Sequence, residues 1–302
     1  MREKDSNETT PVSVAVLGTG TMGSAMARRL LGAGMSVAVW DRTEEHTERL
    51  RADGAQGFRD AHDAVASARI VITTLPTAQA VAELMVESGA IDSLASGAVW
   101  AQMGTIGVAE TGQLDALVRS RRPEAYFVDA PVSGSRQPAE EGELLVLASG
   151  PDDARSIVEP VFSILGKRTL WLGQAGLGTR LKLVLNTWLA FQVEAAVESA
   201  ALAGQLGVSG DALMDALTGS PLASGLSLAK LAKIQANDLS ADFALQWALK
   251  DLDLVAAAVG TAHVPIAHAI AERWRALVEQ GFGNLDVSAA ALGIGAQELT
   301  SK

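Results

Sequence analysis

The chain has 302 residues, which is enough for two domains of ordinary size. Its 48% hydrophobic and 20% charged residues, with no block rich in proline, glutamine or serine, exclude disordered and fibrous proteins. The formal net charge of −11 argues against nucleic acid and anionic membranes as partners.

The first part of the chain has the pattern of an α/β domain. Residues 1–10 are polar and lack the apolar segment of a secretory signal, so we expect a disordered tail. Short apolar runs then alternate with amphipathic segments, which predicts strands that feed helices in a parallel sheet. Strands are expected at 12–17, 36–40, 70–75, 98–101, 126–129, 144–148 and 169–172, and helices include 22–31, 79–85, 110–119 and 153–165. Residues 11–173 are therefore predicted to form a doubly wound Rossmann-type domain.

The second part carries only helical patterns. Strand signals stop after Gly173, and a glycine-rich turn opens onto a long apolar helical run over residues 179–206. Further helices are expected at 209–217, 226–235, 243–259, 265–279 and 287–292. Residues 174–302 are thus predicted to form an all-α domain for substrate binding and oligomerisation.

The same long apolar runs bear on assembly and location. They leave more nonpolar surface than one protomer can readily cover, which predicts a homodimer, with a tetramer as the alternative. The most apolar late stretch, residues 254–270, is interrupted by glycine, proline and two histidines, so no membrane span is expected. A cytoplasmic location is the default expectation.

A glycine-rich motif follows the first predicted strand and precedes the first predicted helix. Its residues are Gly18-Thr19-Gly20-Thr21-Met22-Gly23. In this GxGxxG pattern, the first glycine permits a tight turn, the second lets backbone N–H groups approach a pyrophosphate, and the third lets helix and strand pack closely. The alternative is a glycine-rich turn without a ligand, but the strand and helix on either side favour a dinucleotide site.

The residues after the second strand bear on which nicotinamide cofactor binds. A carboxylate there accepts hydrogen bonds from a ribose 2′-hydroxyl, whereas a guanidinium pairs with a 2′-phosphate. The chain has both, in Asp41-Arg42-Thr43. We expect Arg42 and the Thr43 hydroxyl to favour NADP, with Asp41 turned aside and NAD as the alternative.

Four motifs occur in order along the chain: the GxGxxG run with Met26-Ala27, Asp129-Ala130-Pro131-Val132-Ser133-Gly134, Gly176-Leu177-Gly178-Thr179-Arg180-Leu181-Lys182, and Lys250-Asp251. Together they resemble the β-hydroxyacid dehydrogenases, the family of 3-hydroxyisobutyrate dehydrogenase, tartronate semialdehyde reductase and the glyoxylate/succinic semialdehyde reductases. The resemblance covers nearly the whole chain after the tail.

The resemblance implies a catalytic centre and a substrate site. It implies that Lys182 is the catalytic lysine and that Asn186 helps to hold the substrate. Ser133 and Gly134 match the loop that binds the substrate carboxylate. The expected reaction is hydride transfer between NADP(H) and a small β-hydroxy acid or semialdehyde.

The resemblance also implies further contacts to the cofactor. Leu75 and Pro76 match the loop after the third strand of the domain. Thr105 matches a cofactor-contacting threonine, and Lys250 matches a lysine near the nicotinamide. We expect no metal site, because the chain has no cysteine and its four histidines lie at no ligand spacing.

Several residues depart from the family pattern. Leu185 stands where the family has the first of two asparagines, so only Asn186 can act. Ser135 replaces a glycine, and Gln102 and Gly104 replace a commoner acid and serine. These departures leave the substrate open.

The local sequence around Lys182 fits acid–base chemistry. An ammonium on the apolar segment Leu181-Lys182-Leu183-Val184-Leu185 is costly unless it reaches water or a partner, and burial lowers its pKa. A lysine with a lowered pKa can protonate a carbonyl oxygen as hydride arrives at carbon. Asn186, four residues on, lies on the same helix face. The alternative is a lysine whose stem covers apolar surface and whose head reaches solvent.

Two other functions are compatible with parts of the chain. Residues 37–43 look much like those of imine reductases, which generally have Asp or Tyr where this chain has Lys182. A sensor that binds the nucleotide without turnover would need neither Lys182 nor Asn186. Both residues therefore favour the hydroxyacid dehydrogenase interpretation.

Overall fold

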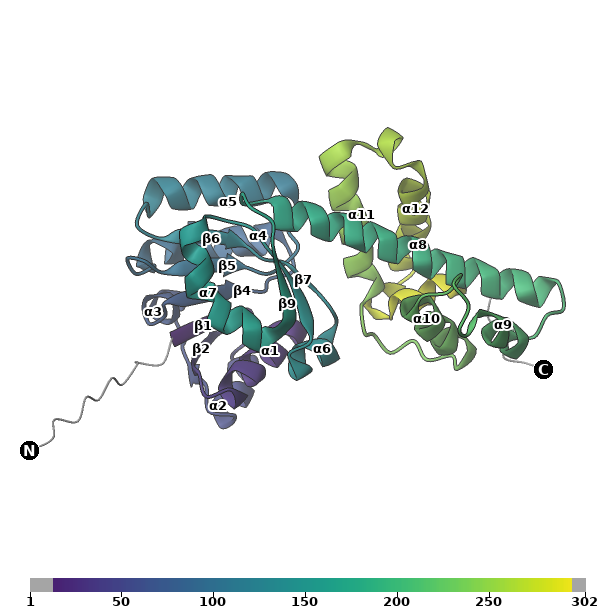
Figure 1. Ribbon diagram of the computed structural model, residues 1–302, viewed down its shortest axis with the longest axis horizontal. Coiled ribbons are helices and arrows are strands. Elements are labelled where there is room, and N and C mark those ends of the chain that lie inside the picture. The colour runs from purple at the N-terminus through teal and green to yellow at the C-terminus, as the bar shows by residue number, and fades with distance from the viewer. Residues whose placement is uncertain (1–12, 295–302) are drawn as a thin grey trace, which may run out of the picture. The chain divides into compact units, whose positions relative to one another are not determined.

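The computed structural model describes residues 13–294, so the predicted tail over residues 1–10 lies outside the described residues. The chain divides into two compact units that meet at Thr179 and Arg180. The first contains the strands, and the second is built from helices (Figure 1).

The main sheet of the first unit has six strands in the order β3-β2-β1-β4-β5-β6. All its neighbouring strands are parallel, as the alternating pattern predicted. The order reverses beside β1, and a doubly wound sheet of this kind binds ligands at the carboxyl ends of its strands next to such a reversal. The strands are β1 (Ser13–Leu17), β2 (Ser36–Trp40), β3 (Gln56–Gly57), β4 (Ile70–Thr73), β5 (Val99–Gln102) and β6 (Tyr126–Asp129).

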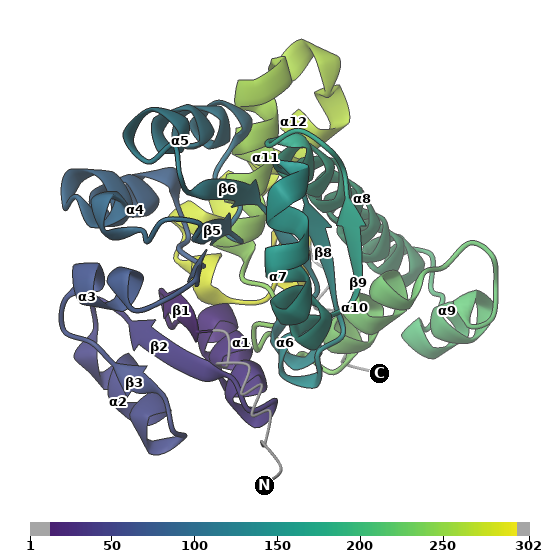
Figure 2. The same cartoon turned by 60° about the vertical axis from the view of Figure 1, so that its left-hand side comes forward.

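Successive residues of the buried strands pack on opposite faces of this sheet. In β1, Val14 and Val16 belong to one hydrophobic core, while Ala15 and Leu17 belong to the other. The first core includes α1 (Thr21–Gly32) and α7 (Asp152–Leu165), and the second includes α3 (Ala61–Ala66) and α5 (Val108–Arg121). Figure 2 shows these helices on the two sides of the strands. Further helices of the unit are α2 (Glu44–Ala52), α4 (Ala78–Val81) and α6 (Arg136–Glu141).

A second sheet was not foreseen as a separate element. It joins β7 (Val132–Ser133), β8 (Leu144–Ala148) and β9 (Gly166–Trp171). Strand β7 runs antiparallel to β8, and β8 runs parallel to β9. The two-residue strands β3 and β7 were missed because such short segments show no periodicity.

Two predicted helices differ in type from the expectation. The helix expected at 79–85 is the short α4 followed by a π-helical turn, Ala82–Glu87. The last expected helix is the 3-10 segment Val287–Ile294. Periodicity alone does not separate these helix types over so few residues.

The helical unit has its own hydrophobic core. The long helix α8 (Leu177–Gln205) supplies Ala190, Val193 and Val197, and Trp274 is fully buried in the same core. The other helices are α9 (Gly210–Leu217), α10 (Gly225–Gln235), α11 (Leu245–Val259) and α12 (Pro265–Glu279). Among residues 13–294, no helix combines the length and the apolar character that a membrane span requires.

Candidate active site

The turn between β1 and α1 has the steric features expected of a pyrophosphate-binding loop. Gly18 has a φ of +90°, a backbone angle that residues with a side chain rarely adopt. A β-carbon at Gly23 would overlap the carbonyl oxygen of Gly18, so α1 packs directly on the turn. At Gly20, no atom lies within 4 Å of the place that a β-carbon would take, which leaves the backbone open to a ligand. No side chain caps the first turn of α1, so its N–H groups suit an anion.

Asp41 is held by backbone donors on two sides. Its Oδ2 accepts a hydrogen bond from the Thr19 N–H at 2.6 Å, and its Oδ1 accepts one from the Thr43 N–H at 2.9 Å. The carboxylate therefore ties the glycine-rich turn to the end of β2. Arg42 and the Thr43 side chain, by contrast, are exposed.

The other predicted cofactor residues of the first unit follow neighbouring strands. Leu75 and Pro76 come after β4, and Thr105 comes after β5. A β-carbon at Gly104 would lie 2.5 Å from the carbonyl oxygen of Leu75, so the two loops are in close contact. Because parallel strands end at one edge of a sheet, these residues share that edge with the glycine-rich turn.

Gln102 stabilises the loops at this edge of the sheet through hydrogen bonds. It is fully buried, and its Oε1 accepts a hydrogen bond from the Thr73 hydroxyl at 2.6 Å. Its Nε2 donates to the carbonyl oxygen of Gly104 at 3.1 Å. The side-chain amide of Gln102, a residue that departs from the family pattern, therefore has hydrogen-bond partners on both sides. These hydrogen bonds fix the loop before Thr105.

Ser133 is the last residue of β7, and Gly134 follows it. Gly134 has a φ of +132°, and a β-carbon there would lie 2.7 Å from the side chain of Leu144. Within the part of the chain that the structure describes, the Ser133 hydroxyl has no hydrogen-bond partner. The hydroxyl is thus available to a ligand.

In the helical unit, Lys182 and Asn186 lie one turn apart on α8, and Lys250 and Asp251 lie on α11. The Asn186 side-chain amide donates to Oδ2 of Asp251. Nζ of Lys250 lies 3.0 Å from Oδ1 of the same carboxylate, which is 3% exposed. Asp251 therefore connects two of the residues that the resemblance implied.

The surroundings of Lys182 disfavour its charged form. Desolvation lowers the pKa of the Lys182 ammonium from its usual 10.5, the negative charge of Asp251 raises it, and the positive charge of Lys250 lowers it. The net direction is downward, because desolvation has the largest effect. A lysine with a lowered pKa is suited to exchange a proton with a substrate.

Asp251 is the residue that sequence reasoning passed over. Lys250-Asp251 looks like an exposed pair on a helix, and only the lysine was assigned a role. The sequence nevertheless held a signal. If α8 packed against α11, the Asp251 carboxylate could balance the charges of Lys182 and Lys250 and accept a hydrogen bond from Asn186. Among residues 13–294, no group of acidic and histidine side chains is arranged to hold a metal ion.

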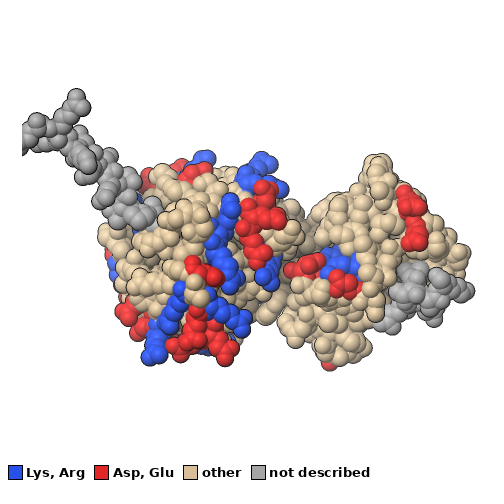
Figure 3. All heavy atoms as spheres, turned by 90° about the horizontal axis from the view of Figure 1, so that it is seen from below, with Lys and Arg blue, Asp and Glu red and all other residues tan. Residues whose placement is uncertain are grey.

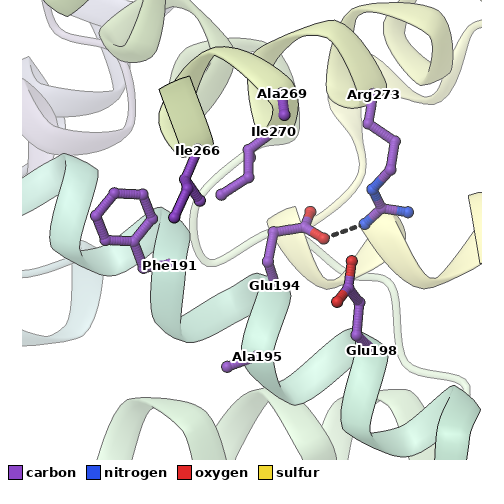
Figure 4. Close-up of a pocket in the computed structure, with 8 residues that line it drawn as sticks. All are labelled: Phe191, Glu194, Ala195, Glu198, Ile266, Ala269, Ile270 and Arg273. Atoms are coloured by element: carbon purple, nitrogen blue, oxygen red, sulfur yellow. Dashed lines mark hydrogen bonds and ion pairs between the residues drawn. The ribbon is translucent and has the colours of Figure 1, made fainter. Parts of the chain in front are cut away.

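A separate pocket lies on the helical unit, between α8 and α12 (Figure 4). Phe191, Ile266 and Ile270 form its apolar part. At its polar end Arg273 pairs with Glu194, which also accepts a hydrogen bond from the buried Trp274. None of the sequence-predicted site residues lines this pocket.

Comparisons with known families cover nearly all of the described chain. Residues 13–173 match the NAD binding domain of 6-phosphogluconate dehydrogenase. Residues 176–292 match the model described as NAD-binding of NADP-dependent 3-hydroxyisobutyrate dehydrogenase. Both matches agree with the resemblance inferred from the motifs.

Individual relatives support the same assignment. Glyoxylate/succinic semialdehyde reductase 1 of Arabidopsis thaliana is 30% identical over 92% of this chain and 96% of its own length. The structure of Mycobacterium tuberculosis 3-hydroxyisobutyrate dehydrogenase with L-serine superposes with a TM-score of 0.84 at 28% identity, covering 94% of this chain and 99% of the other. An imine reductase from a Pseudomonas species covers the same shares, with 26% identity and a lower TM-score of 0.60.

Proposed function

Because the chain belongs to the NAD(P)-dependent β-hydroxyacid dehydrogenase family, we propose that it transfers a hydride between NADP(H) and a small β-hydroxy acid or the corresponding semialdehyde. The observation that carries this proposal is Lys182, a lysine with a lowered pKa on the same helix face as Asn186. An imine reductase would generally have Asp or Tyr at this position.

The glycine-rich turn fits the proposed cofactor. Gly20 leaves open space above the first turn of α1, where uncapped N–H groups suit the pyrophosphate. Leu75, Pro76 and Thr105 lie at the same edge of the sheet. When bound, the nicotinamide supplies or accepts the hydride.

The chain's own residues handle the proton and the substrate. In the reductive direction, Lys182 donates a proton to the carbonyl oxygen, and in the oxidative direction it takes that proton back. Asn186 orients the substrate, and its amide is held by Asp251. The Ser133 hydroxyl and the backbone at Gly134 bind the substrate carboxylate.

The preference for NADP is supported by the hydrogen bonds that the Asp41 carboxylate already accepts. Its Oδ2 already accepts hydrogen bonds from the Thr19 N–H and hydroxyl, and its Oδ1 accepts one from the Thr43 N–H, so few of its acceptor sites remain for a ribose 2′-hydroxyl. Arg42 and Thr43 remain exposed and can contact a 2′-phosphate. NAD is the alternative cofactor.

The same proposal includes the organisation of the chain: residues 11–173 bind the cofactor, and residues 174–302 bind substrate and mediate assembly. Trp188 is 64% exposed and Ile266 is 67% exposed, although both are large and apolar. On the face in Figure 3, most of the helical unit's described surface carries neither acidic nor basic residues. A second copy of the chain would cover such apolar side chains, so a homodimer is expected, with a tetramer as the alternative. The proposed location is the cytoplasm.

The test is a kinetic comparison of NADPH and NADH with glyoxylate, succinic semialdehyde, methylmalonate semialdehyde and tartronate semialdehyde. Oxidation of NADPH with at least one of them, in preference to NADH, is expected. Binding of NADPH without its consumption across the panel would instead favour a sensor. For the assembly, sedimentation showing only monomers at micromolar concentration would remove the homodimer.

A further inference from the structure

A basic pocket lies between α1 and α2 in the first unit. Its volume is about 230 Å³, and no acidic residue lines it. Thr21, Ser24 and Arg28 share one face of α1, and His46 and Arg49 lie one turn apart on α2. The lining is completed by Thr19 from the glycine-rich turn and Arg136 from α6.

The arginines of this pocket retain unused donors. Arg28 pairs through Nε with Asp53 at 2.7 Å, and Arg136 pairs through Nε with Glu140 at 2.8 Å. A guanidinium has five N–H donors, so the terminal nitrogens of both remain available. The guanidinium of Arg49 has no ion pair or hydrogen bond within residues 13–294. Arg49 thus contributes an uncompensated positive charge.

The pocket adjoins the end of β2. Thr19, which lines it, donates its N–H to Asp41 at 2.6 Å. His46, which also lines it, has its Nδ1 3.4 Å from Oδ1 of Asp41. In a GxGxxG domain, the 2′ position of the adenosine ribose lies at this end of the second strand.

We propose that this pocket binds the 2′-phosphate of NADP and that Arg49 is a specificity-determining ligand, in addition to Arg42. The proposal rests on the NADP preference proposed above. A phosphate monoester brings close to two negative charges and several acceptor oxygens. The planar guanidinium of Arg49 can donate two parallel hydrogen bonds to the phosphate oxygens. Arg28 and Arg136 add terminal N–H donors, and the Thr21 hydroxyl lines the same pocket.

The experiment compares two fragments of the cofactor, 2′,5′-ADP and 5′-ADP, which differ only in the 2′-phosphate. Their affinities for the full chain are measured by calorimetry, so the readout is independent of turnover. Arg49→Gln is expected to weaken 2′,5′-ADP by about tenfold, the equivalent of one charge-assisted hydrogen bond, and to leave 5′-ADP unchanged. The matched control is Arg51→Gln on the same helix, since Arg51 donates to the Gly57 carbonyl and does not line the pocket.

Other outcomes overturn the proposal in distinguishable ways. If Arg49→Gln weakens both fragments equally, or neither, Arg49 does not read the 2′-phosphate. If only Arg42→Gln removes the discrimination, the NADP preference stands and this inference fails. If the unmodified chain binds both fragments equally, the NADP preference itself is wrong, and this inference fails with it.

Discussion

The side-chain amide of Asn186 donates a hydrogen bond to the buried carboxylate of Asp251, across the contact between α8 and α11. The second oxygen of that carboxylate lies 3.0 Å from Lys250 Nζ. Asp251 is therefore a positioning residue, which acts on the proposed substrate-binding amide and on the charge near Lys182.

Asp251→Asn is expected to change the pH profile of the reductive reaction. The negative charge of Asp251 raises the pKa of Lys182, so its removal lowers that pKa further. Because the reductive direction needs a protonated lysine, the loss of rate with rising pH should begin at a lower pH than in the unmodified enzyme. The measurement is kcat/KM for semialdehyde reduction against pH.

The matched control for this change is Asp253→Asn on the same helix. Asp253 pairs with Arg275 at 2.6 Å near the surface, so its loss should leave the profile in place. Identical profiles for both variants and the unmodified enzyme would show that Asp251 does not act on Lys182.

Lys182→Met is expected to stabilise the protein at neutral pH. Desolvation holds the pKa of Lys182 below 10.5 in the folded state, so the unfolded chain binds more protons between the folded pKa and 10.5. The unmodified protein therefore gains stability as pH rises through this window, and the advantage of methionine should shrink there. Denaturant unfolding at neutral pH and near 10.5 measures this.

A surface lysine provides the comparison for that experiment. Lys167 pairs with Glu143 at 3.2 Å and is 63% exposed, so Lys167→Met should have little effect at either pH. A Lys182→Met variant that is less stable than the unmodified protein at neutral pH would contradict the argument.

Asp286→Ala is expected to destabilise the helical unit by about 3–5 kcal/mol, because it leaves the buried ammonium of Lys230 without its main partner. Asp286 is fully buried and accepts hydrogen bonds from Lys230 at 2.8 Å and from the N–H groups of Asp242 and Phe243. Urea unfolding measures the loss. Glu44→Gln, which breaks the exposed pair with Arg59, should cost about 1 kcal/mol or less, and equal costs would contradict the prediction.

The same carboxylate predicts acid sensitivity. Burial acts to raise the pKa of Asp286, but hydrogen bonds from Lys230 and Ser288 hold it below its usual 3.8. A lowered carboxylate pKa contributes stability that is complete above 3.8 and is lost as pH falls through the folded value. Asp286→Ala should therefore lose less stability on acidification than the unmodified protein does.

Gly20→Ala is expected to fold normally and to bind the cofactor at least about tenfold more weakly, the equivalent of one charge-assisted hydrogen bond. A methyl group there meets no protein atom within 4 Å, but it occupies the space that the pyrophosphate needs. Gly32→Ala is the control, because Gly32 lies at the other end of α1 and a β-carbon there also meets nothing within 4 Å. Fluorescence titration with NADPH distinguishes the two, and equal affinities would contradict the proposed pyrophosphate site.

Much of the fold could be predicted because its signals are local. The apolar runs of β1 and β2 and the glycines between them predict a strand, a turn and a helix without reference to the rest of the chain. The absence of strand patterns after Gly173 predicts the helical unit in the same way. The second sheet could not be predicted, because β7 is too short to show a pattern and its pairing with β8 is a tertiary event.

The site was predictable only where a single segment carries it. Lys182 and Asn186 share one helix face, so their spacing relates them. The link to Asp251 depends on how α8 packs on α11, and the basic pocket joins Arg49 to Arg136 from elements far apart in the sequence. Neither contact produces a periodic pattern in the sequence, so neither could be predicted from it.

The most direct test of the central claim is the turnover of Lys182→Ala beside its affinity for NADPH. If Lys182 is the proton donor, kcat should fall by about 10² or more while the dissociation constant of NADPH stays nearly unchanged. Turnover that survives the substitution, or an equal loss of cofactor binding, would contradict the role proposed for this lysine.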